Sequence, residues 1–108
     1  MDQKILQITF KYNLTTEELG KDFEPLADPI SQVPGLLWKT WTVDEKEHLF
    51  SGIYLFATQD ALDAYIDGEI VAGVLKHPAL SNFDVKKLDI IEEFSLKTRA
   101  PVGAAAIA

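Results

Sequence analysis

The chain has 108 residues, 47% of them apolar, which suffices for one core and therefore predicts a single domain. Ten Lys and Arg residues stand against 17 Asp and Glu residues, and the net charge of −7 argues against nucleic-acid binding, which needs clustered cations. The absence of cysteine excludes a disulfide framework, a thiolate metal site and a cysteine nucleophile. We also find no basic leader and no apolar run near the ~20 residues that span a bilayer. We therefore expect a cytoplasmic protein with no membrane partner.

The first predicted strand covers residues 4–12, and a helix follows it. Apolar side chains alternate with polar ones along this strand, as they do where one face is buried: Leu6, Ile8, Phe10 and Tyr12. Thr15 and Glu18 have the spacing of a capping box, which predicts the start of the helix. Pro25 lies inside the helix, where proline removes a backbone donor and clashes with the preceding turn, so we expect a kink or break. The proline-containing segment 29–35 is expected to end the helix.

Residues 33–58 contain both tryptophans and five of the eleven aromatic residues of the chain. They predict a strand at residues 35–43, a short charged connection at 44–47 and a second strand at 48–57. A sheet with large aromatic side chains on both faces needs cover on both faces. Helices can cover one face, and a second subunit is the expected cover of the other.

The two tryptophans are expected on opposite faces of this sheet. Neighbouring side chains in a strand point in opposite directions, and Trp38 and Trp41 are three residues apart. We expect Trp38 to share the helix-covered face with Tyr54 and Phe56. Trp41 is then expected at a dimer contact, together with Lys39 in a salt bridge across the barrel.

A second helix and a fourth strand complete the pattern. Thr58 is the expected N-cap of this helix. Gly68 and Gly73 each weaken it by roughly 1 kcal/mol relative to alanine, so we expect a bend or an interruption. Pro78 disfavours helical geometry in the residue before it and marks the end of the helix. The fourth strand is predicted at residues 82–91.

These six elements follow the order β-α-β-β-α-β of a ferredoxin-like α+β fold. It predicts a four-stranded antiparallel sheet in the order 4-1-3-2 with both helices on one face. Two such sheets that pack through their open faces form a dimeric α+β barrel, so we expect a homodimer. The domain is predicted to cover residues 1–100, and residues 101–108, small and apolar without a period, are predicted to be a C-terminal tail.

The tryptophan-rich segment also carries a family resemblance. The run PGLLWKTWT at residues 34–42, then Glu45-Lys46, then GIYLF at residues 52–56, resembles the YdhR family of mono-oxygenases. The resemblance covers roughly the first two-thirds of the chain. It implies a dimeric α+β barrel related to small cofactor-independent monooxygenases that act on polycyclic aromatic compounds.

A cofactor-free oxygenase must bind an electron-rich aromatic or enolic substrate, remove a proton and keep water away from the resulting anion. We expect the flat wall of the substrate pocket to consist of five residues: Trp38, Gly52, Tyr54, Phe56 and Tyr12. Gly52 lacks a side chain among large neighbours, so its position is expected to leave space for a flat ligand. The structural alternative is that the aromatic side chains only fill the core.

His48, His77 and Tyr65 are the candidate catalytic residues. Histidine is the usual general base near neutral pH, and a tyrosine hydroxyl can donate to a substrate oxygen. The alternatives are surface histidines and a tyrosine that is capped within the core. No metal is expected, because the two histidines lack acidic helpers at metal-ligand spacing. No cofactor is expected either, since the six glycines form no GxGxxG fingerprint.

The first functional hypothesis is therefore a cofactor-independent monooxygenase, an oxidoreductase that oxidises a small or polycyclic aromatic or enolic substrate with dioxygen. The alternative is a module without catalytic activity that binds a small aromatic ligand or serves only dimerisation. A base inside the pocket would favour the first hypothesis.

Overall fold

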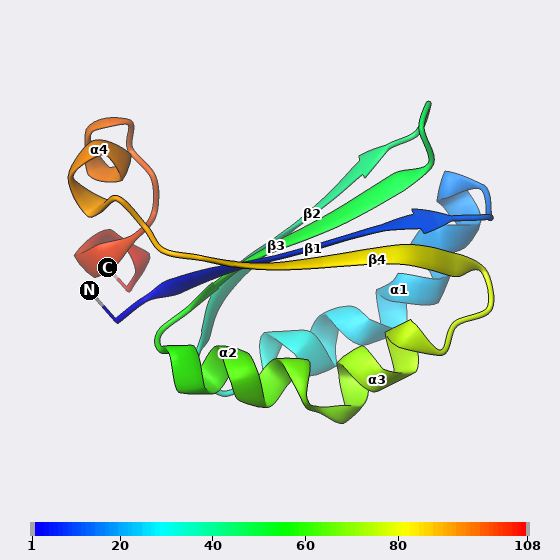
Figure 1. The fold of residues 1–108 in the computed structure, drawn as a ribbon, viewed down its shortest axis with the longest axis horizontal. Helices are drawn as coiled ribbons and strands as arrows, with labels where there is room; N and C mark the ends of the chain where they lie inside the picture. Colours follow the sequence, from blue (N-terminus) through cyan, green and yellow to red (C-terminus); the bar gives the residue numbers. More distant parts are fainter. Residues whose placement is uncertain (1, 108) are drawn as a thin grey trace.

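The computed structural model describes residues 2–107 and contains one antiparallel sheet of four strands (Figure 1). The strand order is β2-β3-β1-β4, which confirms the predicted order and the ferredoxin-like plan. The strands are β1 (Lys4–Tyr12), β2 (Leu36–Asp44), β3 (Leu49–Phe56) and β4 (Leu80–Leu88). The helices α1 (Thr16–Ser31), α2 (Gln59–Ile66) and α3 (Glu69–Leu75) all lie on one side of the sheet (Figure 1). No helix within the described residues is long and apolar enough to cross a bilayer.

Helix α1 begins at the predicted capping box. The Thr15 hydroxyl accepts the Glu18 backbone N–H at 3.1 Å, and the Glu18 carboxylate accepts the Thr15 N–H at 3.0 Å. The helix continues without interruption through Pro25, so a break at this residue was wrong, and it ends at Ser31, within the segment 29–35 that was expected to end it. Both prolines are exposed and lie four residues apart, on the water-facing side of the helix. Water can therefore solvate the carbonyl groups that they leave without a helical partner.

The predicted second helix is interrupted, as expected, and forms α2 and α3. Thr58 is the N-cap of α2, and its hydroxyl accepts the Ala61 N–H at 3.1 Å. The break falls at Asp67 and Gly68, whereas Gly73 lies within α3. Strand β4 begins at residue 80, two residues earlier than predicted.

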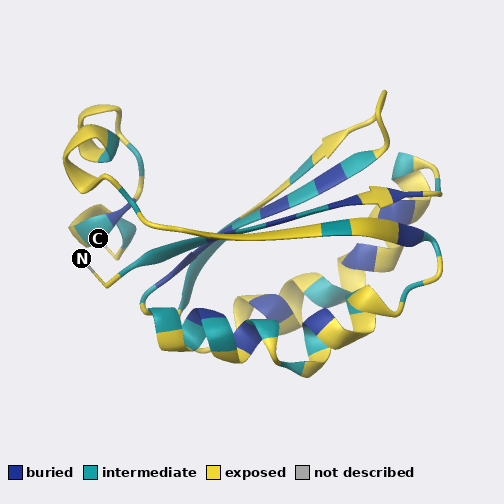
Figure 2. Cartoon of the chain, in the orientation of Figure 1, coloured by how far each residue is buried: buried dark blue, intermediate teal, exposed yellow. Residues whose placement is uncertain are grey.

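The core lies between the sheet and the three helices. Along β1 the side chains that face the helices are buried, whereas their neighbours on the opposite face are only half-buried (Figure 2). Figure 2 also shows β4 exposed over most of its length. Within the described residues, the face of the sheet that points away from the helices, here called the open face, therefore has no comparable cover over most of its length.

The C-terminal segment contains a short helix, α4 (Glu92–Lys97), and a 3-10 helix, η1 (Gly103–Ala106). Both lie beyond the end of the sheet, near the N-terminus (Figure 1). The sequence did not predict α4. Residues of the predicted tail contact the sheet and the residue before it. The Trp38 indole N–H donates to the Pro101 carbonyl at 2.8 Å, and the Gln3 side chain, just before β1, makes two hydrogen bonds with the Gly103 backbone. The domain boundary at residue 100 stays a prediction.

Candidate active site

The register of the β2–β3 hairpin determines which side chains face the helices. Asp44 pairs with Leu49, and four residues connect them. This register places Trp38 opposite Leu55 and therefore on the open face, because directly paired residues point to the same side of a sheet. The two tryptophans do lie on opposite faces, but the expected assignment of the faces was reversed.

Lys39 and Trp41 consequently face the helices. Lys39 pairs with Tyr54 and Trp41 pairs with Gly52, both on the buried side of β3. Alternation within a strand shows which residues of that strand share a face, but it does not show which face of the sheet they occupy. A change of one residue in the register between two strands reverses the face of every side chain, and that register depends on the turn.

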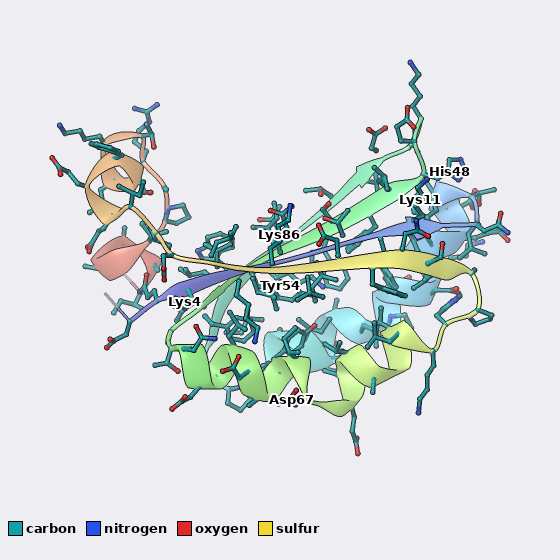
Figure 3. The ribbon with its side chains drawn as sticks, in the orientation of Figure 1. Lys4, Lys11, His48, Tyr54, Asp67 and Lys86 are labelled. Atoms are coloured by element: carbon teal, nitrogen blue, oxygen red, sulfur yellow. The ribbon has the colours of Figure 1, made fainter. Side chains whose placement is uncertain are left out.

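A cavity of about 100 Å³ lies between the sheet and helices α1, α2 and α3. Most of its lining is apolar and comes from all seven elements of the layered core. The polar side chains in the lining are Lys39, Tyr54 and Tyr65. Figure 3 shows Tyr54 between the sheet and the helices. An apolar cavity with a few convergent polar groups is the usual form of a small-molecule site.

Trp41 lies at the mouth of this cavity. Its side chain is 37% exposed, and it also lines two neighbouring hollows of about 290 Å³ and 210 Å³ between α1 and the edge strand β2. Lys39 lines the smaller of these hollows as well as the cavity. The cavity is therefore approached along the α1–β2 edge, past the indole ring.

Tyr54 and Tyr65 form a pair of hydroxyls on the cavity wall. Their oxygens are 3.1 Å apart, and both side chains are buried. Burial raises the pKa of both phenols, and for Tyr65 the hydrogen bond with Tyr54 partly offsets this effect. Both hydroxyls therefore stay protonated at neutral pH. One hydroxyl donates to the other, and the second hydrogen is available to a ligand oxygen.

Lys39 is the only cationic side chain in the cavity lining. Its Nζ lies 3.4 Å from the centre of the Trp41 ring and 4.5 Å from the centre of the Tyr54 ring. It forms no ion pair or hydrogen bond with any residue between 2 and 107. Burial lowers the pKa of Lys39 to about 7, because desolvation disfavours the ammonium form. An amine that is partly neutral at pH 7 can accept a proton.

The space beside Gly52 is already occupied. A Cβ at this position would lie 3.1 Å from Cε1 of Tyr54 and 3.2 Å from Cε of Lys39. The expectation that Gly52 leaves room for a flat ligand was therefore wrong. Its missing side chain instead gives room to the Lys39 and Tyr54 side chains, which meet in front of it.

The other expected wall residues lie outside the cavity lining. Phe56 is fully buried and stacks behind Tyr54, with ring centres 6.0 Å apart. The Tyr12 hydroxyl bonds to the Thr16 hydroxyl at 2.9 Å. Trp38, on the open face, does not line the cavity either. Of the candidate wall residues, the structure places only Tyr54 at the cavity, together with the candidate catalytic Tyr65.

Neither histidine lies at the cavity. His48 ends the β2–β3 connection with a positive φ of 53° and stacks on Tyr12, well away from Tyr54 (Figure 3). His77 lies before β4, where Nδ1 accepts the Ala79 N–H and Nε2 lies 2.9 Å from an Asp22 oxygen. The expectation of a histidine base beside the ligand therefore does not agree with the structure. Within residues 2–107, no group of three or more potential ligand side chains could hold a metal ion.

The family model described as "Putative mono-oxygenase ydhR" matches residues 5–101. The chain belongs to this family. The resemblance that residues 34–56 carry is thereby confirmed, and it extends over most of the chain. A search of curated proteins finds no match.

Solved structures with this fold include a cofactor-independent oxygenase and a heme-degrader. SnoaB, a cofactor-independent oxygenase from Streptomyces nogalater, is 16% identical and has a TM-score of 0.69, with 83% of this chain and 94% of SnoaB covered. The heme-degrader MhuD from Mycobacterium tuberculosis is 17% identical and has a TM-score of 0.63, with 81% of this chain and 95% of MhuD covered. At these identities the similarity shows the fold alone.

Proposed function

We propose that this member of the YdhR family is a cofactor-independent monooxygenase that oxidises a small aromatic or enolic substrate with dioxygen. The observation that carries the proposal is the apolar cavity in which one amine and two hydroxyls converge. Membership of a mono-oxygenase family supports it, and so does the shared fold with SnoaB, which is named a cofactor-independent oxygenase.

The chemistry requires a substrate that can itself reduce dioxygen. Removal of a proton from a phenol or enol gives an electron-rich anion, which transfers an electron to dioxygen. Combination of the two radicals forms a C–O bond, and loss of water then leaves a carbonyl group. The balance is one substrate CH₂ plus O₂ giving one C=O plus H₂O. The protein must supply orientation, a proton acceptor and shelter from water.

The volume of the cavity limits the substrate. About 100 Å³ is less than the engineered apolar cavity of ~150 Å³ that binds benzene, so the cavity holds no more than one ring. A polycyclic substrate has to extend past Trp41 into the adjoining hollow of about 290 Å³.

The proposal includes a cytoplasmic homodimer in which two open faces meet. Ile53 of β3 and Ile5 of β1 lie on this face, paired with Gln7 and Leu88 of the neighbouring strands. Leu55 lies on the same face but is already fully buried within this chain, so it adds no surface to the interface. Exposed apolar residues continue along the C-terminal segment, where Ile91 is 65% exposed and Phe94 is 61% exposed. Burial of such a face against a second copy contributes about 25 cal/mol per Å² of apolar area.

Oxygen uptake with a panel of hydroxylated naphthalenes and anthrones tests this function. We expect stoichiometric uptake of dioxygen with at least one compound in protein stripped of metal by a chelator, and formation of the corresponding quinone. Tight binding of an aromatic compound without oxygen uptake would contradict catalysis and would support the alternative of a ligand-binding module.

A further inference from the structure

The Lys39 amine is held in an unusual position for a lysine. Its stem lies on an edge strand, from which lysine side chains usually reach water, yet the amine is turned inward over the faces of two aromatic rings. The missing side chain of Gly52 makes this position possible, since a Cβ there would press on Cε of Lys39 at 3.2 Å.

The strands and helices that pack around the Lys39 amine present mainly apolar side chains to it. Strands β1 and β4 and helices α1 and α3 contribute only hydrocarbon side chains to the cavity lining. The titratable groups that face the amine are Tyr54 of β3 and Tyr65 of α2, and both hold their protons. Ser31 of α1 lines the outer hollow next to Lys39. No carboxylate is present to neutralise an ammonium group in this cavity.

The geometry points to Lys39 as the group that accepts the substrate's proton. The resulting ammonium group then stays as the counter-ion of the substrate anion. This role makes the substrate a planar phenol or enol with an acidic hydroxyl. This inference rests on the proposed function and assigns a base to it. An ammonium group without a partner in a largely apolar cavity gains most from an anion, because a low dielectric strengthens their attraction. The Tyr54–Tyr65 pair can donate its free hydrogen to the same oxygen.

The proposed step moves one proton and no electrons. The substrate O–H bond breaks, the proton bonds to the neutral Lys39 Nζ, and an ammonium–phenolate or ammonium–enolate pair results. The pKa of about 7 fits this transfer, since a base is most effective when its pKa lies near the working pH. A substrate with a hydroxyl that ionises near neutral pH matches a base with this pKa.

Binding of 4-nitrophenol tests the step without any oxygenation. This single-ring compound ionises near neutral pH, and its phenolate form absorbs visible light. We expect the wild-type protein to bind it as the phenolate beside a protonated Lys39. At about pH 8 the free probe is already mostly phenolate, so the neutral amine should take up close to one proton per bound molecule from the buffer. Calorimetry in buffers of different ionisation enthalpy measures this uptake, and absorbance reports the phenolate.

Two substitutions of the same residue separate charge from proton transfer. Lys39→Arg keeps a permanent cation, so it should bind the phenolate with almost no proton uptake at about pH 8. Lys39→Met should weaken binding at least ~10-fold and abolish the preference for the phenolate form. Lys46→Met, in the exposed β2–β3 connection, is the matched control and should behave as the wild type.

Wild-type binding without proton uptake, or equal phenolate binding by Lys39→Met, would overturn the assignment of Lys39. Failure of the proposed function is a different result. In that case the probe would bind as the phenolate with proton uptake, but no compound of the hydroxylated-aromatic panel would consume dioxygen.

Discussion

The half-buried amine of Lys39 links folding stability to pH. Burial lowers the pKa of Lys39 to about 7 in the folded protein, whereas the exposed amine of the unfolded chain keeps its ordinary pKa of 10.5. Between these values the unfolded chain binds more protons, so stability rises with pH across this window. Below about pH 7 the folded protein bears the full cost of the buried ammonium group.

Replacement by methionine should remove this dependence. We expect Lys39→Met to be more stable than the wild type at neutral pH, and this difference to shrink by about 2 kcal/mol between about pH 7.5 and 9.5. Urea unfolding at the two pH values measures the change. Comparison of the two proteins cancels the tyrosine and carboxylate contributions that they share, and a constant difference would mean that the amine is not buried.

Gly52 gives a second prediction for a single residue. Valine at this position should cost about 1–3 kcal/mol, because its side chain meets Tyr54 and Lys39 at less than normal contact distance. It should also push the amine toward water and raise the pKa of Lys39, which a ¹³C NMR titration of Cε would detect. Gly73→Ala is the control, since no atom lies within 4 Å of its added Cβ, and it should stabilise α3 by up to about 1 kcal/mol. An unchanged Lys39 pKa in Gly52→Val would contradict this packing.

Among the secondary-structure elements, α1 depends most clearly on a local signal. Two prolines lie inside this helix, and its last turn has no basic residue. The cap of its first turn therefore supplies much of its local stability. The capping box satisfies the Glu18 and Thr15 backbone donors with two reciprocal hydrogen bonds.

Thr15→Ala should therefore lower the free energy of unfolding by about 1 kcal/mol. Thr15→Ser retains the hydroxyl and should remain within a few tenths of the wild-type value. Chemical denaturation of the three proteins in parallel measures both changes. Equal losses in the alanine and serine variants would show that the hydroxyl is not the stabilising group.

The β2–β3 hairpin is the element that determines which residues form the site. Four residues connect Asp44 and Leu49, and the last of them, His48, adopts the left-handed conformation. This geometry sets the register that turns Lys39 and Trp41 toward the helices. The sequence predicted a connection of four residues at 44–47, and the structure has four at 45–48. The expected faces were reversed because they were assigned without pairing the two strands across this turn.

For the whole molecule, the prediction concerns the open face. Ile53 lies on this face in the middle of the sheet, paired with Gln7 on one side and Thr40 on the other. We expect a homodimer at micromolar concentration and expect Ile53→Glu to shift it to the monomer, because the substitution buries an unpaired charge in the interface. Sedimentation velocity would measure the change.

Val43→Glu is the matched control for the dimer. Val43 pairs with Phe50 on the helix side of the sheet and is 46% exposed, so its replacement should leave the dimer intact. A wild-type protein that sediments as a stable monomer would contradict the barrel proposed here. Trp41→Glu would not test this interface, since Trp41 faces the helices.

The sequence by itself determined the elements and their order. Period-two alternation in β1, the capping box of α1, the N-cap Thr58 and the interruption near Gly68 are local signals, because each depends on residues a few positions apart. Together with the split β-α-β connectivity, these signals predict the order of the strands in the sheet. The motif at residues 34–56 indicates the family. The continuity of α1 through its prolines was not predictable in this way, since it depends on which side of the helix faces water.

Only the tertiary structure decided the site. Tyr54 and Tyr65 could be named in advance because they lie on the apolar sides of their elements, but the two histidines and Trp38 were expected at the cavity and lie outside it. Lys39 was placed on the wrong face because hairpin register, not strand alternation, sets the relation between strands. Its buried amine further depends on the packing of Gly52, Trp41 and Tyr54, which brings together side chains from two strands, and no local pattern in the sequence encodes that contact.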